Sequence, residues 1–169
     1  MKLNLKYNLI VIMITYITML NSCRHEDALF PYTQQGLNRA SFLLDDKSYK
    51  IDNISYGSDI HLSYISKDSD LYGAITYRDT DHGLFFYLKK IVLKTGRIPF
   101  TVQSGIVYSD EYGKSLQTTK GYIDIKYIDS TNKYKRIIAG EFDFDAWNSS
   151  LSKSVHISRG NFDSEFDIY

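Results

Sequence analysis

The stretch that decides the fold lies in the last third of the chain and reads Ile138-Ala139-Gly140-Glu141-Phe142-Asp143-Phe144-Asp145-Ala146. Its apolar side chains fall on one face, and Glu141, Asp143 and Asp145 alternate with them on the other. A period of two is typical of a strand with one buried face and one face in water. The stretch therefore predicts a half-buried β-strand whose carboxylates lie on the solvent side.

Similar segments, separated by polar turns, precede and follow this strand. Strands are predicted over residues 40–44, 49–51, 60–64, 71–77, 84–88, 97–102, 105–108, 116–119, 121–128 and 155–157. Gly160, where the apolar phase then switches, predicts a β-bulge. Beyond the N-terminal leader, no segment keeps a helical period for more than about ten residues. The sequence predicts an all-β fold, with a single antiparallel β-sandwich or barrel-like domain.

Two local details follow from turn and proline chemistry. Asp45-Asp46-Lys47 separates two apolar segments, which predicts a β-hairpin over residues 40–51. Pro99 has no backbone N–H to donate to a neighbouring strand. The strand over residues 97–102 is therefore predicted at a sheet edge.

The first 22 residues are typical of a bacterial lipoprotein signal peptide. Lys2 and Lys6 precede an apolar run that ends at Leu20 and is too short for a transmembrane helix, which needs about 20 residues. Leu20-Asn21-Ser22-Cys23 then fits the box at which lipoproteins are cut. Cys23 is the predicted lipidation site, and the acyl chains that it would carry, palmitate among them, provide a stable membrane anchor when two or more are present.

The chain is predicted to have three parts: a signal peptide over residues 1–22, a lipidated flexible tether over 23–37, and an antiparallel β domain over 38–169. Cys23 is the only cysteine, so no disulfide stabilises the domain. Arg24-His25-Glu26-Asp27 is similar to the surface-export signal of Bacteroidetes lipoproteins. The predicted location is the outer membrane, and the sequence leaves open whether the domain faces the cell surface or the periplasm.

Composition excludes one broad class of partner. The leader removes two lysines from the 20 basic residues and leaves 18 against 20 acidic ones, a net charge of about −2. This balance argues against a nucleic-acid binder that works by neutralising phosphates. It also argues against a polybasic membrane-binding surface, so the lipid is expected to provide the membrane attachment. No cofactor is predicted.

Three segments together resemble a known family: Gly121-Tyr122-Ile123-Asp124-Ile125, residues 138–146, and Val155-His156-Ile157-Ser158-Arg159-Gly160-Asn161-Phe162-Asp163. Their order is similar to that of strands reading roughly G-x-F-x-F-x-A and then V-x-I-x-x-G-x-F-D in uncharacterised Bacteroidetes lipoproteins. The resemblance covers most of the mature chain. It implies an all-β lipoprotein with no assigned activity, and it offers no functional residues to carry over.

The sharpest enzymatic hypothesis uses Glu141, Asp143 and Asp145. Glycoside hydrolysis needs two carboxylates about 5 to 9.5 Å apart, and side chains two positions apart on a strand are about 7 Å apart. The strict alternation favours instead a solvated strand face. No catalytic residue is therefore assigned, and a glycan hydrolase stays an alternative.

Metal binding is also weakly supported by the sequence. Three acidic residues share one strand face near the C-terminus, Asp163, Glu165 and Asp167, but a straight strand cannot wrap a calcium ion by itself. The four histidines lack the spacing of zinc ligands: His25, His61, His82 and His156. No metal site is predicted.

Aromatic side chains provide the favoured hypothesis. Four are predicted in loops or on polar strand faces, where flat rings can hold sugars or a protein partner: Tyr108, Tyr112, Tyr122 and Trp147. If these four side chains cluster on the surface, their arrangement favours a binding role. If they are scattered or buried, it favours a structural role. The sequence predicts a non-catalytic binding or interaction module for a glycan, peptide or envelope protein. The alternatives are a carboxylate-based glycan hydrolase and a structural subunit of an envelope complex.

Overall fold

The structure is a computed structural model, and it describes residues 29–52, 59–76, 83–101, 104–110 and 112–169. The predicted signal peptide, Cys23 and the acidic residues that follow it lie outside these ranges. Within them, no helix is long and apolar enough to cross a membrane. The strands are β1 (Arg39–Leu44), β2 (Lys47–Asp52), β3 (Asp59–Ile65), β4 (Asp70–Thr76), β5 (Gly83–Leu88), β6 (Gly96–Pro99), β7 (Gly105–Ser109), β8 (Ser115–Asp129), β9 (Ile137–Asn148) and β10 (Lys153–Ile168).

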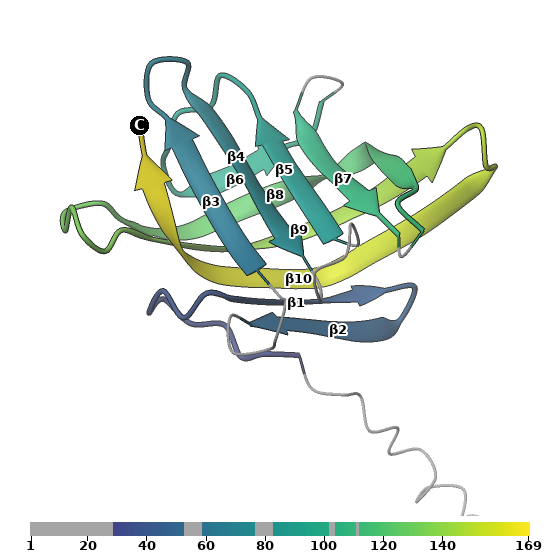
Figure 1. Cartoon of the computed structure of the whole chain (residues 1–169), viewed down its shortest axis with the longest axis horizontal. Coiled ribbons are helices and arrows are strands. Elements are labelled where there is room, and N and C mark those ends of the chain that lie inside the picture. The colour runs from purple at the N-terminus through teal and green to yellow at the C-terminus, as the bar shows by residue number, and fades with distance from the viewer. Residues whose placement is uncertain (1–28, 53–58, 77–82, 102–103, 111) are drawn as a thin grey trace, which may run out of the picture.

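Seven of these strands close into a barrel (Figure 1). The order around the barrel is β3, β4, β5, β7, β8, β9 and β10, and β10 pairs with β3 to complete the circle. Neighbouring strands are antiparallel except at this closure, where Phe166–Ile168 runs parallel to Leu62–Tyr64. The all-β prediction is confirmed, and the barrel is the architecture that the chain adopts.

Three long strands extend past the barrel, and two of them pair with strands that lie outside it. β8, β9 and β10 have 15, 12 and 16 residues. Because β10 is so long, it pairs with β1 as well as with β3, and β8 likewise pairs with both β6 and β7. The β1–β2 hairpin therefore continues the sheet beside the barrel (Figure 1). β6 pairs with β8 on one side, at the end of the strand order, as Pro99 predicts.

The predicted hairpin and bulge are both confirmed. Asp45 and Asp46 form the turn between β1 and β2 with positive φ values of 46° and 67°, as a tight two-residue hairpin requires. In β10 the register with β9 shifts between Ile157 and Gly160. A Cβ atom at Gly160 would lie 2.2 Å from the ring of Phe142, so the bulge needs a glycine there.

Aromatic rings fill the middle of the barrel core. Phe142 is 1% exposed, and four rings surround it at centroid distances between 5.9 and 6.4 Å: Phe42, Phe86, Phe144 and Phe162. These residues come from four strands, β1, β5, β9 and β10. The alternation that predicted β9 as half-buried thus places its apolar face in the centre of the core.

Replacing Gly121 by alanine is expected to be more destabilising than the same change at Gly96. Both glycines have a strongly positive φ, 143° and 132°, so alanine is strained at either site. A Cβ at Gly121 would lie 2.4 Å from the carbonyl oxygen of Asp143, whereas none of the described atoms lies within 4 Å at Gly96. We expect Gly121→Ala to cost about 1–3 kcal/mol more, measured by urea unfolding of both variants. Equal losses in the free energy of unfolding of the two variants would show that crowding at Gly121 adds no cost.

The β7–β8 loop is organised by a buried carboxylate, Asp110. It accepts hydrogen bonds from the N–H groups of Tyr112 and Lys114, and the Lys153 ammonium lies 3.0 Å from its Oδ2. Burial alone would raise the pKa of Asp110. The hydrogen bonds from Lys114, Lys153 and Tyr112 outweigh it and hold the pKa below its ordinary value.

This pKa shift predicts an acid-dependent part of the stability. A carboxyl group whose pKa is lower in the folded state stabilises the fold above its unfolded pKa, about 3.9, and loses that contribution as pH falls through the folded value. We expect Asp110→Asn to be less stable than the natural protein at pH 7, and the difference to shrink below about pH 4. Denaturant unfolding at a series of pH values measures this. A difference that stays constant down to pH 2.5 would count against it.

Candidate functional site

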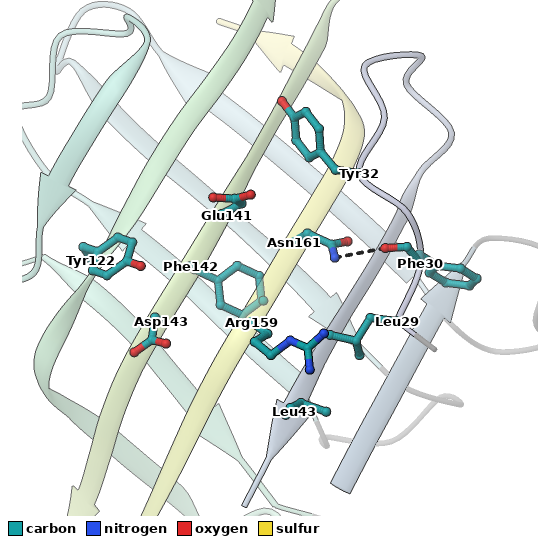
Figure 2. Close-up of a pocket in the computed structure, with 11 residues that line it drawn as sticks. Leu29, Phe30, Tyr32, Leu43, Tyr122, Glu141, Phe142, Asp143, Arg159 and Asn161 are labelled. Carbon is teal, nitrogen blue, oxygen red and sulfur yellow. Dashed lines mark hydrogen bonds between the residues drawn. The ribbon is translucent and has the colours of Figure 1, made fainter. Parts of the chain in front are cut away.

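A groove of about 580 Å³ lies over the outer faces of β8, β9 and β10 (Figure 2). Its volume is within the range of small-molecule sites, about 300–1,000 Å³. The residues that line it come from an N-terminal segment, β1 and these three strands: Leu29, Phe30, Tyr32, Leu43, Tyr122, Glu141, Phe142, Asp143, Arg159, Gly160 and Asn161. Tyr122 stands on one side, and the N-terminal segment on the other (Figure 2).

A buried carboxylate on β10 holds the N-terminal segment in place. Asp163 is 2% exposed and accepts hydrogen bonds from the hydroxyl of Thr33 and from the N–H groups of Gln35 and Gly36, at 3.2 and 2.7 Å for the last two. Arg39 donates to the same threonine hydroxyl from the neighbouring strand β1, at 3.0 Å. The carboxylate that the sequence offered as a calcium ligand therefore anchors the backbone.

A second pair of contacts fixes the part of the segment that reaches the groove. The N–H of Phe30 donates to Ser41 Oγ at 2.9 Å, and the side-chain amide of Asn161 donates to the Phe30 carbonyl at 3.2 Å (Figure 2). We call residues 29–36 the N-terminal strap. The predicted flexible tether over 23–37 is therefore wrong for the strap, because β1 and β10 supply hydrogen-bond partners along it.

Two carboxylates of β9 face the groove. Glu141 and Asp143 lie on the outward face, and their separation by Phe142 confirms the predicted alternation. Glu141 is exposed and lies 3.5 Å from the Lys126 ammonium, which is also 2.8 Å from Asp124. The backbone of Asp143 belongs to the β8–β9 ladder, but its carboxylate forms no hydrogen bond or ion pair with another residue in the described part of the chain. Its carboxylate can therefore accept hydrogen bonds from a ligand.

The four aromatic residues predicted for binding do not form one cluster. Tyr122 lines the groove, with the Arg97 guanidinium 4.0 Å from its ring centroid. Trp147 is 41% exposed near the end of β9, beside a smaller hollow, and Tyr112 is 76% exposed in the β7–β8 loop. Tyr108 is 4% exposed in the barrel core. Its predicted place on a polar face is wrong, because its position in β7 is in phase with the inward side chains.

Several groove residues were missed by reasoning from the sequence: Phe30, Tyr32, Arg159 and Asn161. The first two lie in a segment that looked like a tether. The last two flank Gly160, and Arg159 has a φ of 52° at the bulge. The apolar phase switch at Gly160 is the signal that could have pointed to them, because a bulge redirects the side chains beside it.

Asp145 and His156 line the smaller hollow and belong to an ionic cluster on β8, β9 and β10. Lys120 Nζ lies 2.9 Å from one carboxylate oxygen of Asp145, and His156 Nδ1 lies 2.7 Å from the other. The bond from Lys120 is the main cause that lowers the pKa of Asp145, and the contact with His156 acts in the same direction against partial burial. The Asp145 carboxylate is therefore occupied by Lys120 and His156, although it lies on the same face of β9 as Glu141 and Asp143.

The remaining candidate ligands stay apart. His61 on β3 lies 2.9 Å from the Ser63 hydroxyl, and His25 and His82 fall outside the described residues. Glu165 and Lys135 form an ion pair at 3.5 Å on the barrel surface. Over the described ranges, no group of three acidic, histidine or cysteine side chains is placed to hold a metal ion.

Comparison with known proteins does not assign a function to the groove. No protein-family model, curated protein or solved structure matches the chain. The function is therefore inferred from the chemistry of the groove.

Proposed function

We propose that the protein is a lipid-anchored cell-envelope protein, attached to the outer membrane through Cys23, whose groove binds a glycan without cleaving it. The supporting observation is the mixed lining of the groove. Tyr32 and Tyr122 supply ring surfaces in the same groove as the carboxylate of Asp143 and the amide of Asn161 (Figure 2). Phe30 contributes its backbone, because its ring points away from the groove toward Arg39 and Lys50.

This combination fits the two kinds of surface on a sugar ring. The C–H groups of a sugar form apolar patches that pack on aromatic faces, and its hydroxyls donate to carboxylates and exchange hydrogen bonds with amides. Asp143 supplies an acceptor for these hydroxyls. An open groove of this size takes a short stretch of a saccharide chain rather than a whole protein surface.

Glycan hydrolysis is the second candidate, because Glu141 and Asp143 are neighbouring carboxylates in the same groove. A glycosidase needs one carboxyl group kept protonated, which requires a dry or negatively charged environment. Glu141 is exposed and next to Lys126, a cation. The surroundings of Glu141 are the reverse of what a general acid needs, so binding without cleavage is the better-supported function.

Removing the Tyr122 ring or the Asp143 carboxylate from the groove is expected to weaken glycan binding. We expect Tyr122→Ala and Asp143→Ala each to raise the dissociation constant at least tenfold, about 1.4 kcal/mol. Calorimetric titration of the mature chain carrying Cys23→Ser with neutral, amino-sugar and uronate tetrasaccharides measures this. Tyr112→Ala is the matched control, because this tyrosine is exposed in a loop away from the groove lining.

The same panel separates binding from hydrolysis. Unchanged affinity in both groove variants would contradict the proposed site. If the natural protein releases new reducing ends from a tetrasaccharide, and Glu141→Gln and Asp143→Asn do not, the hydrolase replaces the binding module as the function. Binding with no release of reducing ends supports the proposal.

A further inference from the structure

The strap shortens the connection between the domain and its predicted anchor. If residues 23–37 were free, they would allow the domain to move up to about 50 Å from the membrane, at roughly 3.3–3.6 Å per residue. The hydrogen bonds of the strap fix residues 30–36 on the barrel, so that only the six steps from Cys23 to Leu29 remain. Their greatest reach is about 20 Å.

That reach is short compared with the domain itself. β10 has 16 residues and is about 50 Å long at the rise of a strand. A domain held by a connection shorter than its own length cannot present every face to the membrane equally. The face from which the connection leaves is kept closest to the bilayer.

The connection leaves from the groove. Leu29, the first described residue, is one of the residues that line it, and the strap forms one of its sides (Figure 2). β4 lies across the barrel from β9, three positions away through β10 and β3 in the strand order. The outward side chains of β4 therefore point away from the groove side.

We infer that the groove opens toward the membrane that holds Cys23, and that its ligand is the saccharide headgroup of a lipid in that membrane. This inference rests on the proposed glycan-binding function and on lipidation at Cys23. A ligand in the same membrane is confined to the layer that the groove can reach, which raises its effective concentration over that of a free saccharide. The strap thus defines both the position of the groove and the source of its ligand.

The orientation is tested with a fluorophore on an introduced cysteine. Cys23 is the only natural cysteine and carries the lipid, so Tyr32→Cys and Ala74→Cys each provide a unique thiol. Tyr32 lines the groove, and Ala74 is half-buried on the outer face of β4. In phosphatidylethanolamine–phosphatidylglycerol vesicles with spin-labelled headgroups, we expect quenching at position 32 to be at least twice that at position 74. Twenty Gly-Ser residues inserted between Cys23 and Leu29 should remove the difference.

Equal quenching at the two positions would overturn the orientation, while glycan binding by the Cys23→Ser chain would still stand. Loss of that binding would overturn the proposed function, while unequal quenching would still stand.

The source of the ligand is tested separately. The best-binding tetrasaccharide is coupled to a lipid in the same vesicles and compared with the free form. We expect the lipid-coupled form to occupy the groove at a concentration at least tenfold lower. Equal potency of the two forms would overturn the headgroup assignment.

Discussion

Replacing Phe142 by alanine is expected to lower the free energy of unfolding by about 3–5 kcal/mol. Phe142 is 1% exposed, and its ring is within 6.4 Å, centroid to centroid, of four other phenylalanine rings. Alanine would remove this buried surface and leave a cavity among side chains from four strands, which cannot all move in to fill it. Urea unfolding followed by circular dichroism measures the loss.

Phe85→Ala is the matched control for this prediction. Phe85 is on β5 next to Phe86, but it points outward and is half-buried. Its truncation should cost clearly less than that of Phe142, because water and mobile neighbours can occupy the space on the barrel surface. A cost for Phe142→Ala no greater than for Phe85→Ala would show that the ring cluster is not the centre of the core.

Replacing Asp163 by alanine is expected to release the strap and to lower the free energy of unfolding by about 3 kcal/mol. The change would leave the hydroxyl of Thr33 and the N–H groups of Gln35 and Gly36 without their acceptor. Because the strap forms one side of the groove, glycan affinity should fall in the same variant. Hydrogen exchange at the two amides and limited proteolysis within residues 29–36 measure the release.

Asp167→Ala is the control for the strap. Asp167 is exposed four positions along the same strand, and the Tyr169 hydroxyl donates to its carboxylate at 3.4 Å. This variant should leave exchange at Gln35 and Gly36 unchanged. Continued protection of those amides in Asp163→Ala would contradict the anchoring role of Asp163 and the short connection inferred from it.

Much of the secondary structure could be predicted from local patterns. The alternation in residues 138–146, the polar turn at Asp45-Asp46, the phase switch at Gly160 and the proline at position 99 each depend on neighbours in sequence, and each prediction is confirmed. Alternation shows which side of a strand is buried, but it does not show which strand lies beside it. The closure of β10 on β3 joins Phe166 to Leu62, so no local signal could predict it.

The groove could be predicted less well than the strands, because it depends on contacts between residues that are far apart in the sequence. The strap has no periodic pattern, and its order depends on Asp163, 127 residues away from Gly36. Tyr122 was found because it alternates with buried residues. Tyr108 was predicted in a loop or on a polar strand face, but it is 4% exposed and in phase with the inward side chains of β7. A polar tip on a large apolar body is compatible with burial, so tyrosine is a weak guide to exposure.

The groove between the strap and Tyr122 is proposed to bind a glycan. The most direct measurement is an NMR titration of the mature Cys23→Ser chain with the tetrasaccharide panel, followed through backbone amides and the indole of Trp147, the one tryptophan of the chain. We expect at least one saccharide to shift the amide signals of Tyr122, Asp143 and Asn161 and to leave the indole signal in place. A panel that shifts none of these amides, or that shifts the indole instead, would contradict this proposal.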